Sequence, residues 1–380
     1  MKIIRYLLVP IILFLSACAG TLPSPTLSLA TQPVQSNDSL PTIRPTLESP
    51  SPTPNPSPTL TPTQESLPLL QVITKDNVDK LSLLRTLPIP GFKNSSVSQC
   101  TVGFSPDGAL LAGVCNYSTV PVWDVLSGEL KYSLLPEASH EVGIAFNPTG
   151  EVLAVGGFSG EIHLFDIATG QTLPVSASFP SQVWDIAFSP AGDQLAASTF
   201  STGAFLVSYP GGMPIWNSGE SSHESVLSLA FSPDGSQVAF GRLSKGVMIL
   251  SAQDGTIITE MHIPAPVGDV TYSPNGQWLV AGSDDNKIRL WDTVGYSQTL
   301  TLVGHAGYVN GVAFNPDGSL LISGSHDHKV GVWDVSTGKL LRFLEGHENT
   351  VLRLSINPSG TLIASISWDG TVRLWGVKTE

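Results

Sequence analysis

The sequence predicts an all-β fold made of seven similar repeats. The first observation is compositional: 36 Gly and 30 Pro occur among 380 residues, and both residue types interrupt helices and mark turns. The second is a turn motif that recurs seven times, at intervals of 42, 42, 43, 41, 42 and 42 residues. A period of this length indicates one supersecondary unit per repeat.

The recurrent motif, called the repeat turn below, is Ser or Asn, then Pro, a variable residue and Gly. It occupies residues 105–108, 147–150, 189–192, 232–235, 273–276, 315–318 and 357–360. Ser or Asn begins a type I turn, Pro fixes φ at the second position, and Gly takes the left-handed fourth position. Each turn follows a segment ending in an aromatic residue or Ile and precedes a short apolar run, which predicts a β-hairpin in every repeat.

Aromatic-Asp dipeptides follow most repeat turns. They are Trp123-Asp124, Phe165-Asp166, Trp291-Asp292 and Trp333-Asp334, while the last repeat keeps only Trp375 and the third and fourth repeats lack the dipeptide. Gly304-His305 and Gly346-His347 open the last two repeats. Together these features resemble the WD-repeat β-propeller family over residues ~81–376. The resemblance implies an all-β, seven-bladed WD-repeat propeller with four strands per blade.

The resemblance also implies a hydrogen-bonded tetrad in each of the last two blades, running from Asp through His and Ser to a Trp indole. The residues are His305, Ser323, Asp327 and Trp333 in blade six, and His347, Ser365, Asp369 and Trp375 in blade seven. Blade five keeps Asp285 and Trp291 but has Ala281 at the Ser position, and blades one to four lack the tetrad. The two halves of the ring should therefore differ in stability. A Ser-His-Asp set also suggests a hydrolase, but a set repeated at equivalent positions favours structure, so we expect no enzyme and no catalytic residue.

A strand before the first repeat is expected to close the ring. Five residues follow Trp375, too few for a fourth strand of blade seven, and residues 81–87 have strand character. We expect that segment to supply the missing outer strand, which removes an open sheet edge.

The N-terminus predicts an export signal. Lys2 and Arg5 precede an apolar run over residues 7–15, which is too short to span a membrane comfortably. The sequence Leu15-Ser16-Ala17-Cys18 resembles the lipobox of bacterial lipoproteins. This implies removal of residues 1–17, lipid on Cys18, and a place on the extracytoplasmic face of a bacterial cell membrane. An ordinary secretory signal with a chance cysteine is the alternative.

A tether is predicted over residues 18–68, before a folded part at 69–380. Residues 19–68 contain 12 Pro, 17 Ser or Thr, and a single basic residue, Arg44. Such a segment cannot bury enough apolar surface to offset its conformational entropy, so we expect a disordered stalk. A proline-rich ligand for a partner's groove is the rival interpretation.

Charge and motifs exclude several function classes. The 18 basic and 31 acidic residues give a net charge of −13, so we expect no nucleic-acid partner. The sequence has no P-loop, dinucleotide fingerprint or HExxH motif, so we expect no cofactor. His326-Asp327-His328 and the acidic run at residues 284–286 are poor metal candidates, and we expect no metal.

Cys100 and Cys115 lie on neighbouring strands of blade one and could be oxidised in an exported protein. If the repeat turn pairs Ser105 with Ala109, Cys100 faces Val114 and the two cysteines point to opposite faces. That register opposes a disulfide, although a bulge would reverse it, and both outcomes stay open.

WD-family propellers bind partners on the face carrying the loops between blades and the loops between second and third strands, called the upper face below. Two loop positions per blade are expected there. The first set is Asn116, Phe158, Phe200, Leu243, Asp284, His326 and Trp368, and the second is His140, Gln182, Trp184, Tyr308 and Asn310, with Arg353 nearby. The candidate binding residues are Phe158, Trp184, Phe200, Tyr308, Asn310, His326 and Trp368. We expect the aromatic ones to form a partial ring around one opening.

The sequence therefore predicts a monomeric, membrane-tethered scaffold that binds an unidentified protein. The alternative is a small-ligand receptor or propeller enzyme that uses the central channel. Its functional residues would then be Asp284, His140 and His326.

Overall fold

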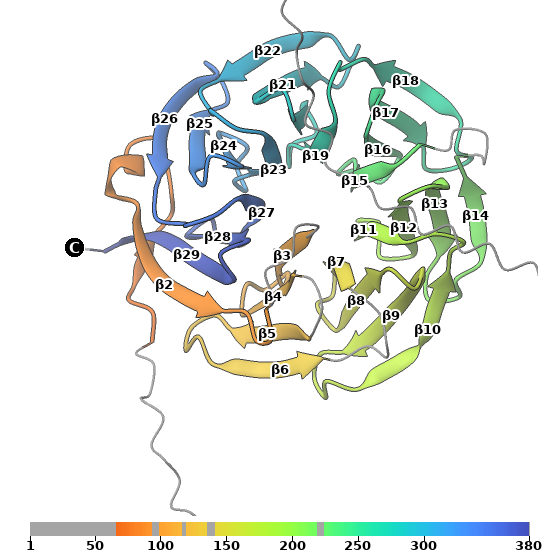
Figure 1. Cartoon of the computed structure of the whole chain (residues 1–380), viewed down its shortest axis with the longest axis horizontal. Helices are drawn as coiled ribbons and strands as arrows, with labels where there is room; N and C mark the ends of the chain where they lie inside the picture. Colours follow the sequence, from red (N-terminus) through yellow and green to blue (C-terminus); the bar gives the residue numbers. More distant parts are fainter. Residues whose placement is uncertain (1–65, 93–98, 116–118, 135–140, 219–223, 380) are drawn as a thin grey trace, which may run out of the picture. The chain divides into compact units, whose positions relative to one another are not determined.

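Seven antiparallel sheets, six of them four-stranded and one five-stranded, surround a central channel (Figure 1). The computed structural model describes residues 66–92, 99–115, 119–134, 141–218 and 224–379. Cys18 and the predicted signal and tether up to residue 65 lie outside the described residues, as do Asn116 and His140. Within the described part, no helix is long and apolar enough to cross a membrane.

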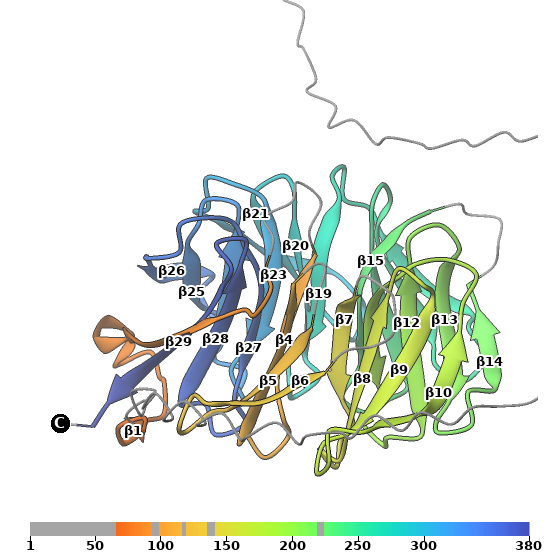
Figure 2. The same cartoon turned by 60° about the horizontal axis from the view of Figure 1, so that its bottom comes forward.

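Each sheet is a blade whose strands follow chain order between the channel and the rim (Figures 1 and 2). Blade one contains β3 (Cys100–Phe104), β4 (Leu110–Cys115), β5 (Val120–Asp124) and β6 (Leu130–Leu134). Blade two contains β7 (Glu141–Phe146), β8 (Val152–Gly157), β9 (Glu161–Asp166) and β10 (Thr172–Ser178). Blade three contains β11 (Val183–Phe188), β12 (Gln194–Thr199), β13 (Gly203–Ser208) and β14 (Pro214–Asn217). Blade four contains β15 (Val226–Phe231), β16 (Gln237–Arg242), β17 (Gly246–Ser251) and β18 (Ile257–Met261).

The remaining blades follow the same plan, except that blade seven takes strands from both ends of the chain. Blade five contains β19 (Val267–Tyr272), β20 (Trp278–Ser283), β21 (Lys287–Asp292) and β22 (Gln298–Val303). Blade six contains β23 (Val309–Phe314), β24 (Leu320–Ser325), β25 (Val330–Asp334) and β26 (Lys339–Leu344). Blade seven contains β27 (Val351–Ile356), β28 (Leu362–Ser367), β29 (Thr371–Lys378) and β2 (Ser82–Pro88), with β1 (Leu70–Gln71) added beside β29.

The core lies between neighbouring blades. Every residue of β4, β8, β24 and β28 is buried, because these second strands are covered by the blades on both sides. Leu110 and Val122 of blade one, for example, share a hydrophobic cluster with Leu153 and Phe165 of blade two. Outer strands are buried at fewer positions, as in β22, where only Leu302 is buried. Each blade therefore depends on its neighbours for its core.

The repeat turns have the predicted conformation. In blade one Gly108 lies at φ 73° and donates its N–H to the Ser105 carbonyl at 2.8 Å. Ser105 Oγ accepts the Leu110 N–H at 2.9 Å. The glycines of all seven repeat turns have φ between 69° and 76°, a region that L-residues with a side chain avoid. The repeat turns mark the lower face, opposite the upper face.

The register predicted for blade one was wrong. Ser105 pairs with Leu110 rather than Ala109, because the serine hydroxyl and N–H both bond to Leu110. Cys100 therefore faces Cys115, with 4.2 Å between their Cα atoms, and the two form a disulfide. The other six blades have a bulge near the start of the innermost strand. At the same position, the innermost strand of blade one pairs regularly with the second strand, and the disulfide joins the two strands.

The ring is closed by an N-terminal segment, residues 66–88, that contacts three blades. β2 pairs with β29 over Ser82–Pro88, at the position expected for the missing outer strand. Upstream of it, the Leu67 N–H donates to the Leu126 carbonyl of blade one at 2.9 Å, and Lys75 Nζ lies 2.6 Å from Asp334 Oδ1 of blade six. The short 3-10 helix η1 (Val78–Lys80) supplies carbonyls to Arg342.

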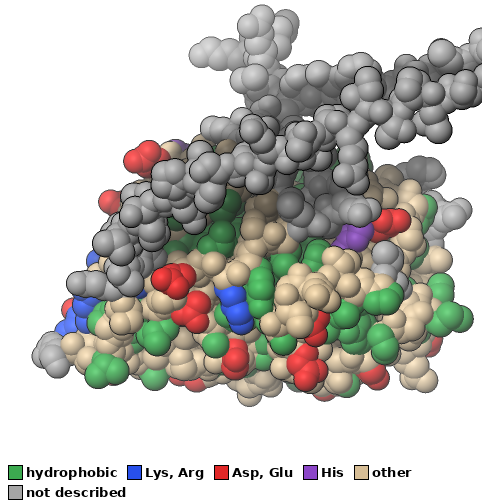
Figure 3. Space-filling model, turned by 90° about the horizontal axis from the view of Figure 1, so that it is seen from below, with side chains coloured by type: hydrophobic (Ala, Val, Ile, Leu, Met, Phe, Trp, Pro, Cys, Tyr) green, Lys and Arg blue, Asp and Glu red, His purple; other side chains and the backbone are tan. Residues whose placement is uncertain are grey.

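One side of the ring shows few basic side chains (Figure 3). On the side of the ring shown in Figure 3, acidic side chains are scattered, basic ones are few, and hydrophobic ones occur in small groups. On this side of the ring, the side chains agree with the acidic balance of the sequence (Figure 3).

Candidate functional site

Tyr308, His326 and Trp368 form one aromatic cluster on the upper face, between blades six and seven. The ring centroids of Tyr308 and His326 are 5.1 Å apart, and those of His326 and Trp368 are 5.4 Å apart in an edge-to-face arrangement. Tyr308 is 47% exposed, whereas His326 and Trp368 are half-buried. Burial lowers the pKa of His326, and the neighbouring His328 lowers it further. His326 is therefore mainly neutral at pH 7, and the cluster is an uncharged aromatic surface.

Trp184 and Phe200 form a second cluster on blade three. Their rings are stacked, with centroids 5.3 Å apart and planes inclined by 17°. Trp184 is the bulged residue of β11, and the Phe200 N–H donates to the Gln182 carbonyl at 3.0 Å, which holds the two loops together. The buried indole N–H of Trp184 has no hydrogen-bond partner among the described residues.

The ring contacts among the expected aromatic residues form two clusters, Trp184–Phe200 on blade three and Tyr308–His326–Trp368 on blades six and seven. Phe158 lies in the turn between β8 and β9 and is half-buried. Asn310 is the bulged residue of β23, and its carbonyl accepts a hydrogen bond from Arg353.

The blade-six tetrad has the geometry that the family resemblance implied. His305 Nδ1 lies 2.8 Å from Asp327 Oδ2, and His305 Nε2 lies 2.7 Å from Ser323 Oγ. The Trp333 indole N–H donates to the same serine oxygen at 2.7 Å. Burial acts to raise the pKa of Asp327, but hydrogen bonds from His305 and from the Ala306 N–H outweigh it and lower the pKa to about 2.

The blade-seven tetrad repeats this arrangement. His347 lies 2.7 Å from both Asp369 Oδ2 and Ser365 Oγ, and the Trp375 indole N–H donates to Ser365 at 2.9 Å. Burial lowers the pKa of His347, although Asp369 favours its charged form. Both tetrad serines are fully buried and their oxygens already accept an indole N–H. They are inaccessible to a substrate, so the arrangement satisfies buried polar groups rather than activating a nucleophile.

Blades four and five lack the tetrad but contain other polar networks. In blade five, Arg289 pairs with Asp285 at 2.5 Å and donates to Ser283 Oγ at 3.2 Å. In blade four, the buried Arg242 donates to Glu260 at 2.6 Å and lies 3.7 Å from the buried Glu224. The blade-four pairs join the second strand to the outer strand and to the loop before β15, and the blade-five pair joins the third strand to the turn before it.

The channel contains charged residues that the sequence analysis did not assign to it. Asp185, Asp269 and Arg353 occupy one repeat-equivalent position, three residues before the end of the innermost strands β11, β19 and β27. Asp185 Oδ2 accepts the Leu229 N–H at 3.2 Å, and Asp269 Oδ2 accepts the Val312 N–H at 2.9 Å. Each carboxylate thus provides a hydrogen-bond acceptor for a backbone N–H on the exposed edge of the next blade's innermost strand. Aligning the seven repeats on their strand ends would have found them.

Arg353 reaches across the channel. Its guanidinium donates to the carbonyls of Gly268, at 3.0 Å, and Asn310, which belong to the bulges of blades five and six. Burial raises the pKa of Asp185 to about 7, against the opposing effect of Arg353 and with a further rise from Asp269. Burial also raises the pKa of Asp269. The three side chains line a cavity of about 610 Å³ that opens toward the repeat turns.

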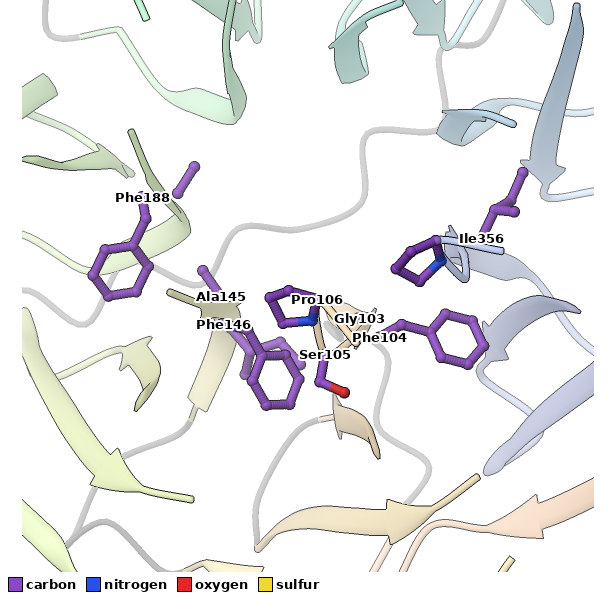
Figure 4. Close-up of a pocket in the computed structure, with 11 residues that line it drawn as sticks. Gly103, Phe104, Ser105, Pro106, Ala145, Phe146, Phe188 and Ile356 are labelled. Atoms are coloured by element: carbon purple, nitrogen blue, oxygen red, sulfur yellow. The ribbon is translucent and has the colours of Figure 1, made fainter. Parts of the chain in front are cut away.

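The lower end of the channel is apolar. Phe104, Phe146 and Phe188 end neighbouring innermost strands and line a smaller pocket of about 320 Å³ together with Pro106 and Ile356 (Figure 4). Ser105 contributes the one labelled hydroxyl, which is engaged in its own turn. In the described residues, no group of three or more His, Cys, Asp or Glu could hold a metal ion.

The fold is a seven-bladed β-propeller, and the tetrads of its last two blades are similar to those of WD repeats. The family model of the WD domain, G-beta repeat, matches residues 218–259, 255–292, 296–334 and 338–376. These ranges correspond to blades four to seven, so the second half of the ring consists of WD repeats, within a seven-bladed β-propeller. Propellers of this family commonly serve as protein-interaction scaffolds. The chain matches no curated protein.

Proposed function

We propose that this protein is a membrane-tethered, extracytoplasmic scaffold that binds another protein through the upper face of its propeller. The observation that carries the proposal is the pair of aromatic clusters, Trp184–Phe200 and Tyr308–His326–Trp368, at loop positions of the same face. Rigid aromatic side chains that present both an apolar face and a polar edge dominate binding hot spots.

The position of the N-terminal segment is compatible with binding at the upper face, because the segment attaches to the opposite face. Leu67 bonds to Leu126 in the turn after β5, and Ile73 bonds to Gly360 in a repeat turn, so the described chain begins at the lower face. The predicted tether and the lipid on Cys18 precede this point. Cys18→Ala should therefore move the protein from the membrane fraction to the soluble extracytoplasmic fraction.

The Cys100–Cys115 disulfide supports export. Structural disulfides form in oxidising compartments and are rare in a reducing cytosol. Both cysteines are buried, at 0% and 1% exposed, which suits a structural bond rather than a reactive pair.

Site-specific photo-crosslinking in intact cells tests the binding face. A photoreactive residue replaces Tyr308 or, as a matched control, Ile257 on outer strand β18, which is 61% exposed. The proposal predicts a crosslinked protein from position 308 and none from position 257. Equal crosslinking from both positions, or none from position 308 in a folded protein, contradicts it.

A small-ligand receptor using the channel is the second candidate, because Asp185, Asp269 and Arg353 line a cavity of about 610 Å³. It ranks second because all three side chains already bond to backbone groups of neighbouring blades. A metabolite that raises the melting temperature of the wild-type protein but not of Arg353→Met would favour this candidate.

A further inference from the structure

Blade five departs from the other blades in the turn after its third strand. The fourth residue past the end of that strand adopts a left-handed conformation in six blades, and in five of them it is glycine, namely Gly128, Gly170, Gly212, Gly255 and Gly338, with φ between 63° and 74°. In blade five this residue is Tyr296, at φ 53°. A tyrosine in this region is strained where glycine is not, and strained residues concentrate at functional sites.

A second departure lies next to the first. The innermost strand ends in Phe104, Phe146, Phe188, Phe231, Phe314 or Ile356 in the other six blades. In blade five it ends in Tyr272, which is 7% exposed and therefore places a hydroxyl group in a position otherwise occupied by hydrocarbon. Burying a hydroxyl is unfavourable unless it is hydrogen-bonded.

The two tyrosine hydroxyls meet at Gln237 of blade four. Tyr296 Oη donates to Gln237 Oε1, and Tyr272 Oη lies 3.5 Å from both that oxygen and Tyr296 Oη. Burial raises the pKa of both tyrosines, so both hydroxyls are neutral and able to donate and accept. The amide oxygen of Gln237 is thus occupied, and its amide nitrogen remains for another acceptor.

A polar cavity of about 470 Å³ opens at this point on the lower face, between blades four and five. Its wall contains Tyr272, Tyr296 and Gln237 together with Asp234, Asn275 and Thr293. Hydrogen bonds from Ser232 and from the Ser236 N–H lower the pKa of Asp234, so its carboxylate is ionised at neutral pH. The volume is that of a small-molecule site, and the wall offers aromatic surface, hydroxyls, two amides and one carboxylate.

We propose that this cavity is a saccharide-binding site. The C–H face of a sugar ring packs against a tyrosine ring, while its hydroxyls donate to Asp234 and accept from the amide nitrogens of Gln237 and Asn275. A neutral, hydroxyl-rich ligand fits better than a cation, because the single carboxylate is already held by serine donors. The site lies on the face opposite the aromatic clusters, so it stands or falls independently of the proposed scaffold function.

Saturation-transfer NMR on the full-length protein tests the proposal, with glucose, galactose, mannose, N-acetylglucosamine, maltose and chitobiose as probes. Tyr296→Gly gives blade five the residue of the other blades, and Tyr272→Phe removes only the hydroxyl. Tyr132→Phe is the matched control, because the Tyr132 hydroxyl bonds to Ala168 on the far side of the ring.

The expected result is transfer to at least one of these sugars, with a Kd of about 1 mM or tighter. Tyr272→Phe should weaken binding about 3- to 10-fold, as loss of one hydrogen bond does, and Tyr296→Gly by at least about 10-fold, while Tyr132→Phe leaves it unchanged. Melting curves of each variant show whether the ring is folded. The proposal is overturned if no probe binds the wild-type protein, or if folded Tyr296→Gly and Tyr272→Phe bind as the wild type does.

Discussion

At the scale of single residues, the two tetrads show how one side chain can hold several buried polar groups. Ser323 accepts the Trp333 indole N–H and bonds to His305, and none of its surface is exposed. The sequence was sufficient to name these residues because a family motif places them at fixed spacing. Asp185 and Asp269 belong to no family motif, and only an alignment of the repeats on their strand ends places them at one equivalent position.

Ser323→Ala is expected to lower the free energy of unfolding by about 3 kcal/mol, because it leaves two buried polar groups unpaired at about 1–3 kcal/mol each. Urea denaturation measures the loss. Ser319→Ala in the same blade is the control, since Ser319 only receives a 3.3 Å bond from Asn315, and it should cost less than about 1 kcal/mol. Equal losses for the two variants would mean that the tetrad adds nothing.

The raised pKa of Asp185 predicts that the stability of the protein depends on pH, and Asp185→Asn should remove this part of the dependence. The pKa of Asp185 is about 7 in the folded protein, whereas an unfolded Asp titrates near about 3.9. Between pH ~4 and pH ~7, Asp185 therefore holds a proton in the folded state that it has released in the unfolded state. The contribution of this proton to the free energy of unfolding is fully present below pH ~4 and is lost as pH rises through ~7.

The wild-type free energy of unfolding, minus that of Asp185→Asn, should therefore fall from pH 4 to pH 7, by at most ~1.4 kcal/mol per pH unit, and then stay constant. Urea denaturation at each pH measures it. A difference that rises with pH, or does not change, shows that Asp185 is ionised in the folded state.

At the scale of the elements, the N-terminal segment determines whether the ring stays closed. β2 supplies the outer strand of blade seven, and residues 66–80 contact blades six, seven and one. The strand was predictable from the missing fourth strand of blade seven. The contacts upstream of it were not, because Leu67 and Lys75 follow no repeat pattern and their partners, Leu126 and Asp334, lie far away in the sequence. The register predicted for blade one was wrong by one residue. Ser105 pairs with Leu110 rather than Ala109, and this shift brings Cys100 opposite Cys115.

Leu87→Ala tests the closure. Leu87 is 1% exposed and packs with Val372 and Leu374 of β29, so the substitution should cost about 2–5 kcal/mol of unfolding free energy. Leu83 lies on the same strand but is 42% exposed, and Leu83→Ala should change stability by less than about 1 kcal/mol. Thermal and urea unfolding measure both. Similar small effects would show that β2 is not needed to hold the ring together.

At the scale of the whole molecule, the two faces carry different chemistry. The upper face presents the two aromatic clusters, and the lower face presents the repeat turns, the start of the described chain and the polar cavity of blade five. The ring itself was predictable because seven repeats of one motif permit few other architectures. The split of the upper-face aromatic residues into two clusters was not predictable, because it depends on side-chain contacts between loops, and the contact of His326 with Trp368 joins neighbouring blades.

The most direct test of the central claim is affinity capture from solubilised envelope with the full-length protein as bait. The wild type is compared with Trp184→Ala/Tyr308→Ala on the upper face and with Ile257→Ala on the rim, after melting curves have shown that all three are equally folded. We predict a protein that the wild type and Ile257→Ala capture and the double variant loses. Retention of that protein by the folded double variant would contradict an upper-face binding site.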